Sequence, residues 1–133
     1  MLQKLGWTFG IVFLAVGVLG HVPGITSNGM LLGIFEIDGL HNVIHLLSGV
    51  AAIAAVYTSA AYTRLYFKVF GIVYALVAVV GFLQGGTVLG LIAVNMADNL
   101  LHLVIAAVAL WAGFGMKDEA IPMGMGSSTS AAM

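Results

Sequence analysis

Four long apolar stretches constrain this chain more than any other feature. They run from Leu5 to Val22, from Leu40 to Tyr57, from Tyr66 to Leu83 and from Asn99 to Phe114. A helix needs about 20 apolar residues to cross the hydrocarbon core of a bilayer, and each stretch approaches that length. Because 62% of the 133 residues are hydrophobic and only 7% are charged, the chain cannot cover a water-facing surface. We predict an all-α integral membrane protein with four transmembrane helices, for which the lipid bilayer is the main partner.

The two halves of the chain resemble each other. The matches are Phe9–Val12 with Phe70–Val73, Gly20 with Gly81, Gly24 with Gly85, Asn42 with Asn99 and His45 with His102. Each half contains two apolar stretches, so both copies would cross the membrane in the same sense. We therefore predict two parallel tandem repeats of one helical hairpin, the first at about 4–60 and the second at about 64–115.

These repeats would form a single transmembrane domain over residues 1–116, followed by a polar tail. The tail, residues 117–133, is rich in small and polar residues and is typical of a flexible end. Two connections within the domain, 25–37 and 87–94, are themselves largely apolar. Because water-exposed loops are usually more polar, we expect them to form short turns in the membrane interface.

Charged residues separate by sign along the chain. Lys4, Arg64, Lys68 and Lys117 fall on one side of a four-span protein, and Glu36, Asp38 and Asp98 fall on the other. The positive-inside rule places both termini in the cytoplasm. Since no long basic run is present, a nucleic-acid partner is not expected.

Polar residues gather near the acidic ends of the second and fourth stretches. They are His41, Asn42, His45, Asp98, Asn99 and His102. Four-residue spacing puts His41 and His45 on one helix face, and the same spacing joins Asp98 with His102. Polar groups inside a membrane are costly, so this cluster is the main indication of a functional site.

Three interpretations of the cluster remain open, besides movement of protons or a small solute along it. In the first, Asn42, His45, Asn99 and His102 bond across helices while Asp38 and Asp98 cap helix starts, and no cofactor is needed. In the second, His41, His45, Asp98 and His102 bind a divalent metal. In the third, His45 and His102 are the two axial ligands of a b-type haem.

Small and aromatic residues suggest how the helices pack. We expect close helix contacts at Gly10, Gly20, Gly24, Gly71, Gly81 and Gly85, because glycine lets helix backbones approach in lipid. A glycine face could also support a homo-oligomer. Trp7, Tyr57, Tyr62 and Tyr66 lie near the positively charged ends of the spans, where an aromatic belt would anchor them.

Several motifs together resemble a bacterial membrane family. They are Val22–Thr26, Leu31–Glu36, His41–Gly49, Arg64–Tyr66, Val69–Tyr74 and Asn95–Leu103. The sequence is similar, from about Lys4 to Phe114, to the family known as domain of unknown function 4383. This resemblance implies a four-span protein of the bacterial inner membrane, and it implies no activity or site residues.

The motifs of soluble enzymes are missing from the sequence. There is no nucleophile elbow, phosphate-binding glycine loop or HExxH motif, so we expect no catalytic residues and no enzyme activity. We interpret the chain as a structural or accessory component of a membrane assembly, with haem or metal binding as one alternative. Transport is the other alternative, although residues 53–56 and 108–110 are apolar and interrupt any polar route.

Overall fold

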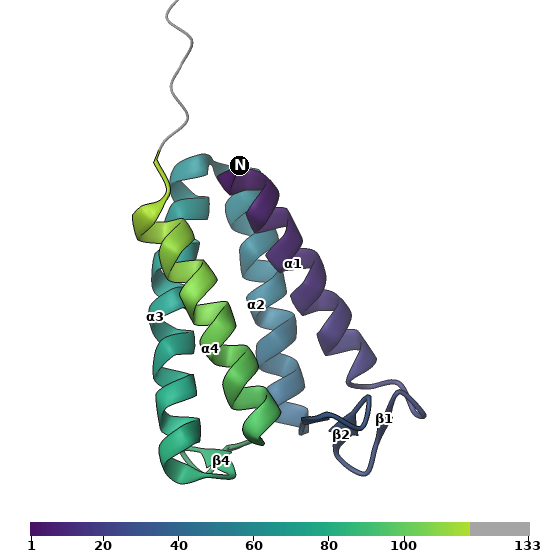
Figure 1. Ribbon diagram of the computed structural model, residues 1–133. Coiled ribbons are helices and arrows are strands. Elements are labelled where there is room, and N and C mark those ends of the chain that lie inside the picture. The colour runs from purple at the N-terminus through teal and green to yellow at the C-terminus, as the bar shows by residue number, and fades with distance from the viewer. Residues whose placement is uncertain (118–133) are drawn as a thin grey trace, which may run out of the picture.

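The computed structural model describes residues 1–117 and contains a bundle of long helices (Figure 1). The helices are α1 (Leu2–Leu19), α2 (Gly39–Thr58), α3 (Ala60–Gln84) and α4 (Met96–Leu110), and α4 continues as the π-helix η1 (Trp111–Gly115). With α4 and η1 taken together, four helices are long and apolar enough to cross a membrane. The prediction of four helices with the length and composition of membrane spans is confirmed, and the predicted flexible tail lies outside the described residues from residue 118 onward.

The helices form two antiparallel hairpins. Helix α1 packs along α2 in the first hairpin, and α3 packs along α4 in the second. Contacts between α2 and α3 bring the two hairpins together. The N-terminus, the α2–α3 turn and the end of η1 lie together at one end of the bundle, and both strand-containing connections lie at the other (Figure 1). Lysine and arginine side chains therefore belong to the first end, which we call the basic end. We call the end that carries Glu36, Asp38 and Asp98 the acidic end.

The connections at the acidic end contain small β-sheets rather than the simple turns expected from the sequence. The first has the antiparallel strands β1 (Thr26–Ser27), β2 (Met30–Leu31) and β3 (Phe35–Glu36), and the second pairs β4 (Thr87–Val88) with β5 (Ile92–Ala93). The described chain is thus mostly, not wholly, helical. Backbone groups near lipid need internal partners, and short ladders supply them where a connection is apolar.

The two β-connections turn in the same way. Leu32 and Leu89 have left-handed φ angles of 56° and 57°, and the following residues, Gly33 and Gly90, have φ angles of 69° and 68°. Such angles are costly for leucine, so each sheet must hold its own turn in place.

Glycines contact neighbouring helices at some of the positions expected from the sequence. A Cβ at Gly71 would lie 2.9 Å from the Leu110 backbone nitrogen, and one at Gly10 would overlap Ile53. A Cβ at Gly20 or Gly81 would likewise overlap the side-chain amide of an asparagine, as described below. These glycines permit close helix packing because any side chain would displace a neighbour.

Gly24 and Gly85 have a different role from the packing role expected of them. Their φ angles are 91° and 81°, and a Cβ at either position would meet nothing within 4 Å. Gly24 lies in the first β-connection, and Gly85 is the left-handed residue that ends α3. The left-handed backbone conformation at these two positions is the reason that they are glycines.

Aromatic side chains divide between the lipid face and the core. Tyr57 and Tyr62 are exposed, as expected for an aromatic belt, whereas Tyr66 is only 6% exposed. Tyr66 packs with Phe67 and Phe70 inside the bundle, so the prediction of an anchoring role does not hold for this residue. Its position on α3 faces α2 instead of lipid.

We expect Gly71→Ala to destabilise the bundle. The new methyl group would meet the α4 backbone, and overpacking of this kind costs about 1–3 kcal/mol. The measurement is the thermal unfolding midpoint of the purified protein in a neutral detergent. Gly86→Ala is the matched control because a Cβ at Gly86 meets nothing within 4 Å, and equal midpoints for the two variants would contradict the packing role.

Candidate functional site

The start of α2 is fixed by the Asp38 carboxylate. One oxygen, Oδ1, accepts a hydrogen bond from the His41 backbone nitrogen at 2.8 Å, which makes Asp38 the N-cap of α2. The other, Oδ2, accepts from the Ala93 backbone nitrogen of β5 at 2.5 Å. Burial by itself raises the pKa of Asp38, but the hydrogen bonds from the backbone amides of Ala93 and His41 oppose this effect, and the pKa is lowered. The carboxylate therefore remains ionised and joins the two hairpins.

The start of α4 is fixed in a related way by Asp98. Asn95 and Asp98 form a reciprocal capping box, in which Asn95 Oδ1 accepts from the Asp98 nitrogen at 3.0 Å and Asp98 Oδ2 accepts from the Asn95 nitrogen at 2.9 Å. Asp98 Oδ2 also accepts from the Glu36 backbone nitrogen of β3 at 2.9 Å. The Asn95 amide donates to the Ile34 carbonyl at 2.9 Å. Each hairpin thus supplies a carboxylate that binds a backbone amide of the other.

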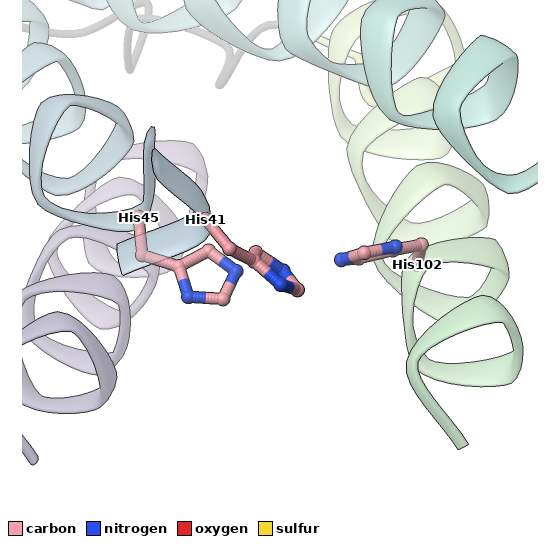
Figure 2. A group of neighbouring side chains, drawn as sticks. All are labelled: His41, His45 and His102. Carbon is pink, nitrogen blue, oxygen red and sulfur yellow. The ribbon is translucent and has the colours of Figure 1, made fainter. Parts of the chain in front are cut away.

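Three buried histidines lie directly below these caps. His41 and His45 project from α2 toward His102 of α4 (Figure 2). One potential ligand nitrogen from each ring lies within 4.8 Å of the others. The ring centroids are 4.5 Å apart for His41 and His45, 5.6 Å for His41 and His102, and 6.4 Å for His45 and His102. We call this group the histidine triad.

The hydrogen bond made by His41 determines which of its nitrogens can bind a ligand. His41 Nδ1 lies 3.0 Å from the Ala93 carbonyl oxygen. A carbonyl only accepts, so Nδ1 carries the proton and Nε2 of the neutral ring keeps its lone pair. His41 Nε2 is buried without a hydrogen-bond partner among the described residues. A histidine that donates one nitrogen to a carbonyl and presents the other is the usual arrangement of a metal ligand.

The other two rings also present buried nitrogens. Nδ1 of His45 and Nδ1 of His102 have no hydrogen-bond partner in the described part of the chain. An unsatisfied buried polar atom costs about 1–3 kcal/mol. Each ring of the triad therefore has one such atom, and a ligand bound at the triad would offset this cost.

The remaining residues of the predicted cluster lie outside the triad. Asp98, expected as a fourth metal ligand, is directed to the backbone of Glu36 and Asn95 and is not part of the histidine group. Asn42 donates to the Gly20 carbonyl at 3.0 Å, within the first hairpin. Asn99 packs on Gly81 within the second hairpin. The Asn42 amide thus joins α1 to α2, and aspartate joins one hairpin to the other.

A further polar group below the triad was not predicted from the sequence. The hydroxyls of Ser48 and Tyr74 lie 3.0 Å apart, and the Tyr66 hydroxyl donates to the Ser48 carbonyl at 3.1 Å. The Tyr74 ring contacts His102, with centroids 5.7 Å apart, and Phe13 lies at the same distance from His45. The spacing of Ser48 three residues after His45 was the one available signal, because it puts both residues on the same face of α2.

The fold and the triad define a multi-pass membrane protein with a cluster of imidazoles enclosed between two helical hairpins. The family model described as "Domain of unknown function (DUF4383)" matches residues 3–115, so the chain belongs to this family. No curated protein and no solved structure matches it. The resemblance predicted from the sequence motifs is confirmed.

We expect Asp98→Ala to loosen the contact between the hairpins. The substitution leaves the amides of Glu36 and Asn95 without their acceptor, and each unsatisfied buried amide costs about 1–3 kcal/mol. Amide hydrogen exchange at the first turn of α4 and in β3 measures the effect. Glu36→Gln is the control because it removes a carboxylate from the same end and keeps the Glu36 N–H. Unchanged protection in Asp98→Ala would show that the bridge contributes nothing.

Proposed function

We propose that this protein binds one divalent transition-metal ion at the histidine triad. The observation that carries the proposal is the convergence of three buried imidazole nitrogens from two hairpins within 4.8 Å. Zinc–nitrogen bonds of about 2.0–2.1 Å put tetrahedral ligands about 3.4 Å apart. Side-chain rotations that move the nitrogens by about an ångström would therefore bring all three within bonding distance of one ion. Three protein ligands leave a fourth position for water or another small ligand.

The donor set limits which metals fit. Neutral imidazole suits zinc, copper, nickel and iron, whereas magnesium and calcium prefer oxygen ligands. Asp98 is occupied by backbone amides, so the triad provides nitrogen donors only. Zn²⁺ and Cu²⁺ are the ions that this set favours by affinity.

A haem between His45 and His102 receives less support. The His41 ring is nearly equidistant from these two rings, at 4.5 Å and 5.6 Å. It therefore lies about where a porphyrin held between them would extend. The same position makes His41 a suitable third ligand for a bare metal ion.

Metal analysis of the purified full-length protein tests the proposal. After chelation and removal of the chelator, the protein is titrated with Zn²⁺ or Cu²⁺, and bound metal is counted by mass spectrometry. We expect one ion per chain. His102→Ala and His45→Ala should each raise the dissociation constant at least about tenfold, since even the loss of an outer-shell partner has an effect of that size.

His21→Ala is the matched control for these variants. His21 lies after α1 and bonds the Gly17 carbonyl at 2.8 Å, outside the triad. Its substitution should leave metal affinity unchanged. Equal loss of metal in His21→Ala and His102→Ala, or no stoichiometric metal in the unsubstituted protein, would refute the proposal. A Soret absorption band in the purified protein would favour haem instead.

Metal binding should also stabilise the bundle. His41 and His45 belong to the first hairpin and His102 to the second, so one ion would link both. An ion at 100 times its dissociation constant adds about 2.7 kcal/mol to the folded state. The unfolding midpoint in detergent should therefore rise with Zn²⁺ in the unsubstituted protein and stay constant in His102→Ala. An equal rise in both proteins would place the stabilising metal elsewhere.

A structural or accessory role is the second candidate. It is supported by the hydrogen bonds that Asp38 accepts from the Ala93 backbone amide and that Asp98 accepts from the Glu36 backbone amide. These bonds make the acidic end a rigid junction between the hairpins. A small bundle of this kind could act as a homo-oligomer or within a larger membrane complex. Transport is less favoured, since the hydroxyl groups of Ser48, Tyr74 and Tyr66 below the triad are followed toward the basic end by fully buried Phe67 and Ala52.

We also propose that the protein arose by duplication of one hairpin and lies in a bacterial inner membrane. A duplicated hairpin is supported by the matching turns at Leu32 and Leu89 and by the equivalent contacts of Asn42 with Gly20 and of Asn99 with Gly81. The resemblance to the family implies a bacterial inner membrane, and the separation of charges supports an orientation with both termini in the cytoplasm. In that orientation the triad lies near the outer surface of the membrane.

A further inference from the structure

The last strand of each connection at the acidic end is held in the same way. Glu36 ends β3, and its backbone nitrogen donates to Asp98 Oδ2 at 2.9 Å. Ala93 ends β5, and its backbone nitrogen donates to Asp38 Oδ2 at 2.5 Å. Glu36 and Ala93 also correspond to each other when the two halves of the chain are aligned. Each hairpin therefore binds the equivalent amide of the other with one carboxylate.

The two carboxylates, however, come from positions that are not equivalent. In α4 the N-cap is Asn95, and the carboxylate belongs to Asp98, the third residue of the helix. In α2 the N-cap is itself the carboxylate, Asp38, and the third residue of the helix is His41. The carboxylate thus stands nearly one helical turn earlier in α2 than in α4. Position 41 is thereby free to carry an imidazole.

Asp38 and His41 together bind both backbone groups of Ala93. Asp38 Oδ2 accepts from the Ala93 nitrogen, and His41 Nδ1 donates to the Ala93 carbonyl at 3.0 Å. Asp38 Oδ1 accepts from the His41 backbone nitrogen at 2.8 Å, which closes a ring of three hydrogen bonds. The His41 side chain is only 3% exposed, and its Nε2 has no partner among the described residues. The ring of bonds fixes the imidazole and leaves Nε2 as the nitrogen that a metal could use.

We propose that Asp38 is a positioning residue of the metal site and that the place of its carboxylate determines the donor set. By holding β5 against the start of α2, Asp38 fixes the carbonyl that orients His41. By binding the Ala93 amide from the N-cap, it also makes a carboxylate at position 41 unnecessary. This inference rests on the proposed metal site. It adds the reason that the triad has a third imidazole where the other hairpin has Asp98.

Asp38→Asn separates the positioning role from helix capping. Asparagine is as good an N-cap as aspartate, so its oxygen can still accept from the His41 nitrogen. Its NH₂ group is a donor and takes the place of the oxygen that binds the Ala93 amide. In the purified full-length protein, the dissociation constant for Cu²⁺ should rise at least about tenfold, the effect of losing an outer-shell partner. The electron paramagnetic resonance spectrum of bound Cu²⁺ should also lose one of its three nitrogen couplings.

Asp98→Ala is the comparison for this variant because it removes the other bridge between the hairpins and leaves the bonds of Ala93 in place. Bound Cu²⁺ should therefore keep all three nitrogen couplings. Loss of the same coupling in both variants would show that the bridges act only by holding the hairpins together, and the positioning role would be refuted.

Moving the carboxylate tests the second part of the proposal. Asp38→Asn combined with His41→Asp gives the start of α2 the same arrangement as the start of α4, with an amide at the N-cap and a carboxylate at the third residue. Asp38→Asn alone should make the Ala93 amide exchange about fivefold faster, because its hydrogen bond is lost. Adding His41→Asp should restore the protection of this amide. The double variant should still bind Cu²⁺ at least about tenfold more weakly, since one imidazole is missing.

Asp38→Asn combined with His41→Ala is the control for the double variant. It removes the same imidazole and supplies no carboxylate, so the Ala93 amide should stay unprotected. Equal exchange of this amide in the two double variants would show that a carboxylate at position 41 cannot replace Asp38, and this part of the proposal would be wrong.

Failure of this inference can be told apart from failure of the proposed function. If the unsubstituted protein takes up no Cu²⁺, the metal site is refuted and the positioning role with it. Amide exchange at Ala93 would then still report which position supplies the carboxylate. If the unsubstituted protein binds one ion and Asp38→Asn shows the same affinity and spectrum, the metal site stands and only the positioning role is refuted.

Discussion

The need to satisfy backbone amides near lipid determines much of this structure. At the acidic end the first amides of α2 and α4 and the amides of β3 and β5 need acceptors. Two carboxylates meet this need, Asp38 for β5 and Asp98 for β3, and each crosses from one hairpin to the other. The histidine triad depends on this exchange, because the docked β5 supplies the Ala93 carbonyl that orients His41.

The fold could be predicted from the sequence to the extent that it depends on length and hydrophobicity. Four spans follow from four apolar stretches, and α2 was placed within a residue of its ends. The small sheets were missed because two-residue strands leave no periodic pattern. Tyr66 was misplaced for another reason: proximity to a charged end suggests an aromatic belt, while the rotation of α3 turns this ring toward α2.

The candidate site was predicted only in part. Helical spacing could show that His41 and His45 share a face, and the matching of His45 with His102 suggested a facing pair. Which helices are neighbours, and how each is rotated, depends on tertiary packing that the spacing does not encode. For that reason His41 was not recognised as the ring between the other two. Asp98 was expected either to cap a helix or to bind a metal, and it caps α4 and accepts from backbone amides.

The exchange of carboxylates has a consequence for how the protein is made. Synthesis delivers the first hairpin to the membrane before the second, so the Glu36 amide emerges well ahead of Asp98, its acceptor. Asp38 likewise has no Ala93 amide to bind until the last connection has formed. The acidic end can therefore close only after the second hairpin has formed. A chain interrupted in the second half would leave exposed amides that membrane quality control could recognise.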